Sequence, residues 1–343
     1  MNIVVVGTNH KFSPIELREK LSFSKRRLRQ ALLLLKESPA LEGAVILSTC
    51  NRMELCASAE DTRAVIEELQ NFISWFHAIG RERIIPYLYI YERDEAIRHL
   101  FSVACGLDSL ILGETQILGQ LKSAFSEARS VGVIDGYLET VFDAAISFAK
   151  RIHQNTKVSE GKISIGSVAI DFIKEKLGNL LDKTIIIIGA GKVTELVLEY
   201  LQDEKPRVVF VSNRTFDKAK ELASRIGQCA VRFDKLPQFL KQADVIISAT
   251  TSPHFIIKKE NLGGVISRKL LIVDLAMPRD VDPKVREIEN VELFNLEDLS
   301  FIVQKNLEKK RHEAEKIEKL INQEVDLLWQ KLTVSELEPV LLP

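Results

Sequence analysis

The sequence carries one cysteine in a setting suited to nucleophilic chemistry. Cys50 lies two residues before Arg52, in a polar break (residues 48–52) between two apolar stretches. A free thiol has a pKa near about 8.5, and it becomes a stronger nucleophile when cations or backbone N–H groups lower that value. A thiolate attacks acyl carbons to form thioesters. Cys50 is therefore a candidate for acyl transfer, and a small buried cysteine at a strand end is the structural alternative.

A second stretch has the glycine pattern of a dinucleotide-binding turn. Gly189 and Gly191 lie between an apolar run and a helical stretch, within residues 185–201. Glycines there let the backbone approach a pyrophosphate, which sits on the N-terminus of the helix. Thr194 stands where the usual fingerprint has its third glycine, which loosens the pattern but preserves the turn. The candidate cofactor-binding residues are Gly189, Ala190, Gly191, Lys192, Val193, Thr194, Asn213, Arg214 and Thr215.

The end of the following strand favours NADP over NAD. NAD sites place an Asp or Glu there to bind the ribose 2′-hydroxyl, whereas this sequence has Ser-Asn-Arg-Thr at residues 212–215. A guanidinium binds a 2′-phosphate through paired, charge-assisted hydrogen bonds. We therefore expect Arg214 to select NADPH, unless it is a solvated surface residue. Hydride transfer from a nicotinamide, joined to a thioester-forming cysteine, predicts reduction of an acyl group to an aldehyde.

Length and composition are those of a globular protein. The 343 residues, 46% hydrophobic and 28% charged, suffice for roughly two cores. The formal net charge of −1 leaves a nucleic-acid partner open, because a local basic patch disappears in the total. The four cysteines form no Cys-x-x-Cys pair, which argues against a zinc site or a disulfide framework. No apolar run has the length of a bilayer span, so we expect a cytoplasmic chain without membrane contact or metal.

The chain divides into three regions. Residues 1–158 mix short strands with amphipathic helices, as in an α+β domain, and one helix is expected to begin with Ser13 as its N-cap. Residues 159–296 alternate helices with continuous apolar runs, which predicts a doubly wound, Rossmann-like α/β domain. Residues 297–343 contain a long charged helix with an apolar seam, either a solvated spacer or half of an interface. The expected apolar strands of the second region are Thr184–Ile188, Val208–Val211, Asp244–Ser248 and Leu270–Val273.

The motif around Cys50 resembles the signature of the glutamyl-tRNA reductase family. Other segments similar to that family occur in the same order, from residue 7 to about 331. They are residues 7–10 (GTNH), 106–109 (GLDS), 113–120 (GETQILGQ), 189–192 (GAGK), 213–215 (NRT) and 275–280 (LAMPRD). The resemblance implies a multidomain α/β enzyme that reduces glutamyl-tRNA to glutamate-1-semialdehyde with NADPH, through a cysteine thioester. This reaction begins tetrapyrrole (porphyrin) synthesis from glutamate.

The resemblance also implies roles for particular residues. Cys50 would be the nucleophile. His99 would donate a proton to the tetrahedral intermediate or to the leaving ribose oxygen, or it would be structural. The substrate presents an ammonium and a carboxylate, for which Glu114 and Arg52 are suited. The residues that would line the glutamate pocket are Thr49, Asn51, Arg52, Ser109, Glu114, Thr115, Gln116 and Gln120.

Partners follow from the resemblance as well. Glutamyl-tRNA is the nucleic-acid substrate, and the aminomutase that consumes glutamate-1-semialdehyde is a possible protein partner. The family continues beyond the long helix into a helical dimerisation domain, whereas this sequence ends at Pro343, so we expect a monomer or a weakened homodimer. Basic clusters at residues 25–27 and 150–151 are candidate tRNA contacts, and a solvated helix face is the plainer interpretation of each.

Two other functions fit parts of the pattern. An oxidoreductase similar to shikimate dehydrogenase also pairs Asn-Arg-Thr with NADP, and it reduces a ketone without a cysteine nucleophile. A catalytically silent protein that binds NADP or tRNA is the non-enzymatic alternative. A glutamyl thioester on Cys50 would separate the first function from both.

Overall fold

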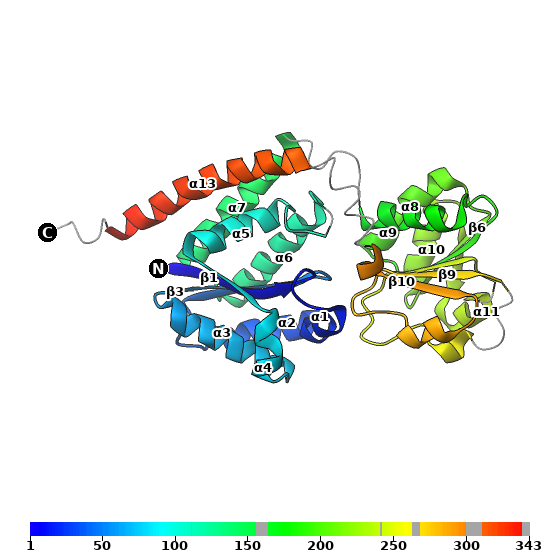
Figure 1. Cartoon of the computed structure of the whole chain (residues 1–343), viewed down its shortest axis with the longest axis horizontal. Coiled ribbons are helices and arrows are strands. Elements are labelled where there is room, and N and C mark those ends of the chain that lie inside the picture. The colour runs from blue at the N-terminus through cyan, green and yellow to red at the C-terminus, as the bar shows by residue number, and fades with distance from the viewer. Residues whose placement is uncertain (111, 156–163, 241, 263–267, 300–310, 338–343) are drawn as a thin grey trace. The chain divides into compact units, whose positions relative to one another are not determined.

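The computed structural model describes residues 1–110, 112–155, 164–240, 242–262, 268–299 and 311–337. Its contacts divide the chain into two compact units, which Figure 1 shows in ribbon form. Unit 1 combines Met1–Glu160 with Leu307–Pro343, and unit 2 is Gly161–Asn306. The domain limits expected from the sequence, 1–158, 159–296 and 297–343, stay a prediction, and the contacts group the C-terminal residues with unit 1.

Unit 1 contains an antiparallel sheet whose strands lie in the order β2-β3-β1-β4. The strands are β1 (Asn2–Asn9), β2 (Gly43–Ser48), β3 (Arg52–Ala59) and β4 (Tyr89–Glu92). In the register of the sheet, Ser48 pairs with Met53 and Asn9 pairs with Arg52. The short turn that carries Cys50 therefore connects β2 to β3, next to the end of β1.

Helices cover both faces of this sheet, with α2 and α3 on one face and α5 and α6 on the other (Figure 1). A helix α1 precedes α2, and Ser13 does not cap it as predicted: the helix follows Pro14, and the Ser13 hydroxyl donates to the backbone O of Asn9 (3.3 Å). The helices are α1 (Ile15–Leu21), α2 (Lys25–Lys36), α3 (Thr62–His77), α4 (Arg81–Ile84), α5 (Arg93–Ala104), α6 (Gln116–Val131) and α7 (Gly136–Asn155).

The long C-terminal helix α13 (Arg311–Leu337) packs on α5 within unit 1. Its residues Ile317, Ile321 and Val325 are buried in the core that the sheet and α5 share. Arg98 on α5 binds two polar side chains of α13, at 3.1 Å and 2.8 Å. The apolar seam is thus covered within unit 1 at these three residues. The start of the predicted helix, at 300–310, lies outside the described residues.

Unit 2 is a six-stranded parallel sheet in the order β10-β9-β8-β5-β6-β7. The chain builds outward from β5 to β7 and then returns to β8 on the other side of β5. This reversal creates a topological switch point between β5 and β8, where ligands bind in open α/β sheets. The strands are β5 (Thr184–Ile188), β6 (Val208–Asn213), β7 (Cys229–Arg232), β8 (Val245–Ser248), β9 (Leu270–Asp274) and β10 (Val291–Asn295).

Among the described residues of this unit, four α-helices join these strands or precede them: α8 (Ile165–Leu177), α9 (Lys192–Glu204), α10 (Phe216–Arg225) and α11 (Leu236–Leu240). Every residue of β5, β8 and β9 is buried, as a sheet covered on both faces requires. The predicted fold class, an α/β protein with a Rossmann-like domain and a long C-terminal helix, is confirmed. Among the described residues, no helix has both the length and the apolar character of a membrane span.

Candidate active site

The turn that carries Cys50 is fastened by backbone and hydroxyl groups. The Thr49 hydroxyl oxygen accepts from the backbone N–H groups of Asn51 (3.1 Å) and Arg52 (3.2 Å). The backbone N–H of His10 donates to the Asn51 carbonyl (2.9 Å). Cys50 is half-buried in this turn, and the side-chain oxygen Oδ1 of Asn51 is buried without a hydrogen-bond partner in the described structure. An unpaired buried acceptor beside Cys50 suits a donor group from a substrate.

A buried charge network lies directly behind this turn. Arg52 Nη1 donates to Glu54 Oε1 (2.6 Å), and Nη2 donates to the backbone O and to Oδ2 (3.0 Å) of Asp108. Arg52 is only 2% exposed and Glu54 is fully buried. The predicted pairing of Arg52 with a substrate carboxylate therefore stays a prediction, and in this geometry the guanidinium meets two carboxyl groups of its own chain.

Both acids of this network are held in the charged form. Burial alone would raise the pKa of Glu54, but His99 and Arg52 outweigh it and hold that pKa well below its usual range. Burial opposes the ionisation of Asp108 as well, and Arg52 together with Lys11 lowers its pKa. The network thus balances positive and negative charge inside the protein.

His99 belongs to the same network. Its Nε2 lies 2.8 Å from Glu54 Oε1, to which the Tyr89 hydroxyl also donates. Its ring stacks on Tyr91, with centroids 4.5 Å apart. The structure therefore fixes the His99 ring, and its role as proton donor stays a prediction. A cavity of about 460 Å³ adjoins this ring, lined by Lys11, Tyr91, Glu95, Arg98, His99, Ser102, Leu107, Asp108 and Glu318.

The loop between α5 and α6 brings the predicted substrate residues towards the turn. Gly106 and Gly113 both have left-handed backbone (φ +73° and +75°), and the Gly113 N–H donates to the Gly106 carbonyl (2.9 Å). A Cβ on Gly106 would lie 2.9 Å from the Glu114 carbonyl oxygen, so only glycine closes this loop without strain. Ser109 hydrogen-bonds the Glu114 side chain. The loop is tied to the Cys50 turn through the contacts of Arg52 described above.

The surroundings of Cys50 differ from the sequence-based expectation that cations would lower its pKa. Burial and the carboxyl group of Glu114 raise the pKa of the Cys50 thiol to about 11, against the lowering effects of Arg18 and Arg52. Burial also raises the pKa of Glu114 itself, while Ser109 and Arg52 lower it. The thiol is therefore held in its protonated form by this arrangement at neutral pH.

The remaining predicted substrate residues lie at the start of α6. Thr115 immediately precedes the helix, and Gln116 and Gln120 lie on its first two turns. Thr115 and Gln120 are exposed, and Gln116 is half-buried. The structure thus gathers five of the predicted residues around Asp108: Cys50, Arg52, Ser109, Glu114 and His99. Thr115, Gln116 and Gln120 lie nearer the surface, at the start of α6.

Three residues of this region escaped the sequence analysis: Glu54, Asp108 and Arg18. Glu54 stands in a strand of eight residues that are all buried, and an acid within so apolar a strand is a signal that could have revealed it. Asp108 lies inside a motif already noted, between Leu107 and Ser109. Arg18 sits among other charged residues of a short helix, where nothing in the sequence distinguishes it from a surface residue.

In unit 2, the glycine loop after β5 has the shape of a phosphate cradle. Gly189 has φ +125°, and a Cβ there would lie 2.4 Å from the Ala249 carbonyl oxygen. A Cβ on Gly191 would meet no described protein atom within 4 Å. Gly191 precedes α9 and provides no side-chain cap for it, so the first N–H groups of the helix remain for an anion. These residues fit the pyrophosphate of a dinucleotide.

The other predicted cofactor residues surround this loop. Arg214 and Thr215 are exposed just after β6, and Asn213 is half-buried at its end. Lys192 is exposed and pairs with Glu195 (3.1 Å), whereas Thr194 is fully buried beneath the turn. Arg214 is thus accessible to a phosphate at the position where NAD sites carry an acid.

On the far side of the switch point, buried acids fasten the loops after β8 and β9. Asp280 accepts from the Ser248 hydroxyl (2.6 Å) and from the backbone N–H of Thr250 (2.9 Å). Asp274 accepts from the backbone N–H of Ala276 (3.0 Å). Burial and the neighbouring Asp280 raise the pKa of Asp274 to about 7. Both loops are therefore held in place at the edge where a dinucleotide would lie.

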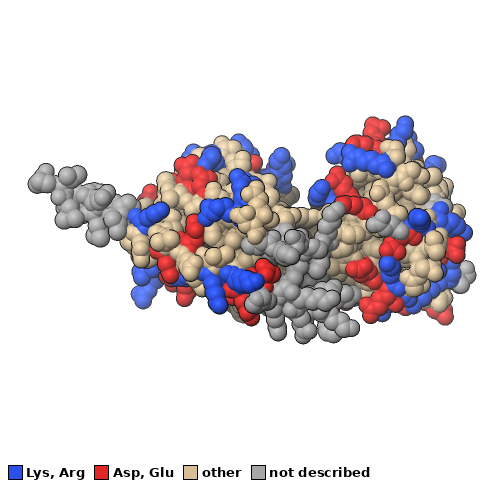
Figure 2. Space-filling model, turned by 90° about the horizontal axis from the view of Figure 1, so that it is seen from above, with Lys and Arg blue, Asp and Glu red and all other residues tan. Residues whose placement is uncertain are grey.

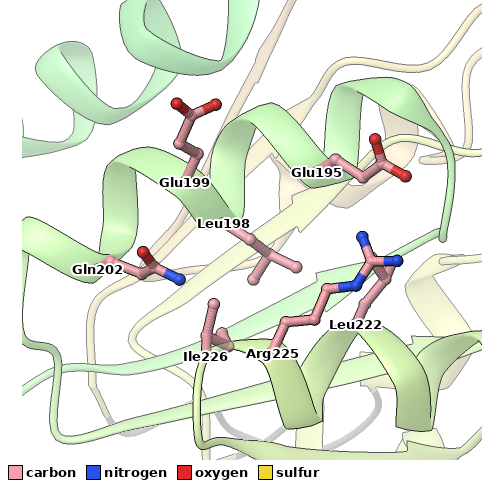
Figure 3. A pocket seen from close by; sticks show the side chains of 7 residues that line it. All are labelled: Glu195, Leu198, Glu199, Gln202, Leu222, Arg225 and Ile226. Atoms are coloured by element: carbon pink, nitrogen blue, oxygen red, sulfur yellow. The ribbon is translucent and has the colours of Figure 1, made fainter.

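A separate groove of about 120 Å³ lies between α9 and α10. In Figure 3, Leu198 points into it and the Arg225 side chain runs along it, while Glu199 points away from α10. The groove contains none of the predicted cofactor residues. Its lining consists of Glu195, Leu198, Glu199, Gln202, Leu222, Arg225 and Ile226.

Charge is mixed on the visible surface. Figure 2 shows Lys and Arg interspersed with Asp and Glu on the described part of this face, over both units. The predicted basic clusters are partly used within the protein. Arg27 donates to the Phe76 carbonyl (2.9 Å) and Arg151 pairs with Glu324 (2.8 Å). Contact of these clusters with tRNA stays a prediction.

Comparison with known proteins shows which families this chain resembles. Residues 6–156 match the model of the glutamyl-tRNAGlu reductase N-terminal domain, and residues 171–302 match that of shikimate / quinate 5-dehydrogenase. The glutamyl-tRNA reductases of Geotalea uraniireducens and Geotalea daltonii are 38% and 39% identical, over all of this chain and 80% of each relative. The solved glutamyl-tRNA reductase from Methanopyrus kandleri is similar, with a TM-score of 0.54 and 40% identity over 96% of this chain and 80% of that one.

Proposed function

The chain belongs to the glutamyl-tRNA reductase family, and on that premise we propose that it reduces glutamyl-tRNA to glutamate-1-semialdehyde through a thioester on Cys50. The observation that carries the proposal is the juxtaposition in unit 1 of a thiol with an acid, Glu114, and an unpaired acceptor, Asn51 Oδ1. The reaction is the first step of tetrapyrrole synthesis from glutamate.

The first half of the reaction is acyl transfer. The Cys50 thiol loses its proton, and the sulfur attacks the carbonyl carbon of the ester between glutamate and the tRNA ribose. The carbon–oxygen bond to the ribose breaks, and the ribose oxygen leaves with a proton while a carbon–sulfur bond remains. Glu114 and Asn51 bind the substrate ammonium, and Thr49, Ser109, Thr115, Gln116 and Gln120 contribute hydroxyl and amide groups to the same pocket.

Glu114 links substrate binding to the ionisation of Cys50. Its carboxyl group raises the pKa of the thiol, so an ammonium that neutralises Glu114 removes one cause of that increase. The thiol is then easier to ionise when glutamate is in place. This coupling protects Cys50 from unselective reaction and favours acylation by the amino acid that carries the matching charge.

The second half of the reaction requires a hydride donor, which we propose is NADPH. When bound to unit 2, NADPH would supply the hydride needed to bring an acyl carbon to the aldehyde level. Gly189, Ala190, Gly191, Val193 and the N-terminus of α9 would hold its pyrophosphate, and Lys192 lies at the same turn. Arg214, between Asn213 and Thr215, would bind the 2′-phosphate. The buried Thr194 would support the glycine turn after β5. Release of Cys50 requires that the carbon–sulfur bond breaks, that its electron pair stays on the sulfur and that the glutamyl group leaves as the aldehyde.

Other parts of the function rest on the family. We propose tRNA as the carrier of the substrate and an aminomutase as the next protein to receive the aldehyde. The cytoplasmic location stays a prediction, supported by the cysteine usage of the chain. Reduction of a small keto acid without tRNA would instead favour the function of a shikimate dehydrogenase.

Replacement of Cys50 by Ser tests the proposal. An alcohol is far harder to ionise than a thiol, so the variant should lose aldehyde formation from glutamyl-tRNA altogether. Cys229→Ser is the matched control, because Cys229 is an exposed cysteine in unit 2, and it should retain normal activity. Substantial reductase activity in Cys50→Ser would exclude the thioester mechanism.

A further inference from the structure

Arg18 of α1 is a buried cation whose contacts lead to the Cys50 turn. The residue is only 4% exposed, and a buried guanidinium requires hydrogen-bond partners. Its Nε donates to the Ser13 carbonyl (3.2 Å) and its Nη1 donates to the Cys50 carbonyl (3.2 Å). One planar side chain thus joins the start of α1 to a turn that lies 32 residues further along the chain.

The bond to Cys50 completes the set of contacts that fix this turn. The Asn51 carbonyl is held by the His10 N–H, and the Arg52 carbonyl is held by the Thr49 N–H (both 2.9 Å). Arg18 holds the carbonyl of Cys50, the residue just before these two, and of the three donors it is the one that carries a charge. The peptide unit of Cys50 is therefore oriented by a cation, which also restricts where the sulfur can point.

Charged groups from three elements act on the Cys50 sulfur. Arg18 on α1 and Arg52 on β3 favour the thiolate, and Glu114 before α6 opposes it, together with burial. The charge of Arg52 is balanced by Glu54 and Asp108. Cys50 is half-buried, and where water is partly excluded a nearby cation acts on an anion more strongly than at the open surface.

We propose that Arg18 is a positioning residue for Cys50: it orients the Cys50 peptide and keeps positive charge near the sulfur while the thiolate attacks and later leaves. This inference rests on the proposed role of Cys50 as nucleophile. It assigns a function in the reaction to a residue outside the motif that carries Cys50.

The test measures the thiolate directly. In a Cys229→Ser background, iodoacetamide reports Cys50, because Cys56 and Cys105 are buried. Labelling rates between about pH 7 and 9 follow the thiolate fraction. Arg18→Met and Arg18→Gln should label about three- to ten-fold more slowly than the parent, since a higher pKa is partly offset by greater nucleophilicity. Arg18→Lys restores the charge and should recover most of the rate.

Arg27→Met is the matched control. Arg27 is another arginine of unit 1 whose guanidinium holds a backbone carbonyl, that of Phe76, and its loss should leave the labelling profile unchanged. If circular dichroism shows that Arg18→Met does not fold, Arg18→Gln replaces it in the labelling test. The glutamine keeps a hydrogen-bond donor but removes the charge. Labelling of folded Arg18→Gln at the parental rate, or equal slowing in Arg27→Met, would overturn the inference. Failure of the parent to form a glutamyl thioester would instead reject the proposed function. The labelling rates would still show whether Arg18 favours the Cys50 thiolate.

Discussion

Around Cys50, unit 1 relies on charged side chains that bind one another, whereas the cofactor loop of unit 2 is shaped by its backbone. Arg52 meets Glu54 and Asp108 in a buried network. The loop after β5 instead depends on Gly189 and Gly191, with Arg214 exposed at its border. The two sites should therefore be sensitive to different substitutions. The site in unit 1 should be disrupted by the loss of a charged group, and the loop in unit 2 by a larger side chain at a glycine.

The largest effect is expected from Glu54→Gln. The change leaves the Arg52 guanidinium buried without one of its two carboxyl partners, which costs about 3–5 kcal/mol of the free energy of unfolding. Activity should fall with it, because Arg52 and His99 lose their common partner. Urea denaturation measures the stability, and Glu60→Gln, at an exposed position just after β3, should change it by less than about 0.5 kcal/mol.

The pH dependence of that loss sharpens the test. The pKa of Glu54 in the folded state is depressed below its ordinary value of 4.5, so its stabilisation is present above that pH and declines as the pH falls through the folded value. The stability difference between wild type and Glu54→Gln should stay constant from neutral pH down to about pH 5 and shrink in stronger acid. A difference that grows on acidification would contradict the assignment.

Gly191→Asp should come next, with an effect confined to unit 2. A carboxylate at the start of α9 occupies the place of a phosphate and repels it, so NADPH affinity should fall at least about 100-fold, or ~2.7 kcal/mol. Acylation of Cys50 should persist, because unit 1 is unchanged. Fluorescence titration gives the affinity, and Gly191→Ala should fold normally. A folded Gly191→Asp that no longer accepts glutamate would show that acylation requires an intact cofactor site.

Arg214→Ala should have a smaller and more selective effect. Loss of a charge-assisted pair to the 2′-phosphate should weaken NADPH binding by about 1.5–3 kcal/mol and leave NADH binding nearly unchanged. Arg225→Ala, which removes an exposed arginine paired with Glu221 on α10, is the control. Equal losses for both cofactors would mean that Arg214 does not discriminate between them.

The smallest effect is expected from Glu114→Gln, and its sign is informative. The Glu114 carboxyl raises the pKa of Cys50, so the variant should ionise Cys50 more readily and label it about two- to ten-fold faster with iodoacetamide near neutral pH. Glutamyl transfer should nevertheless slow, because the ammonium loses its partner. Ser109→Ala serves as the comparison, since it removes the hydrogen bond to Glu114 but leaves the charge. Slower labelling in Glu114→Gln would reverse our account of this pair.

The sequence predicted the interior of the fold better than its edges. The runs at β5, β6, β8 and β9 are recognisable because these strands are covered on both faces. The edge strands β7 and β10 were missed, since each has only some of its residues buried and resembles a loop or a helix end. The seam of α13 was visible as a pattern, but only the contacts with α5 show what covers Ile317, Ile321 and Val325.

For the site, motifs led to Cys50 and Gly189 because their local context is distinctive. The pKa of Cys50 could not be predicted, since it depends on Glu114, which lies 64 positions further on in the sequence, and on burial. Arg52 was expected to face the substrate, and no local pattern indicated that Glu54 and Asp108 surround it. Spacing predicts which residues gather at a turn, whereas charge balance depends on contacts across the whole fold.

Mass measurement of the protein after incubation with glutamyl-tRNA tests the central claim most directly. Without NADPH, we expect a glutamyl adduct on the peptide that contains Cys50, labile to hydroxylamine as thioesters are. On addition of NADPH, the adduct should disappear as glutamate-1-semialdehyde forms in equal amount. Formation of the aldehyde in a protein that never carries this adduct, or an adduct on another residue, would contradict the account.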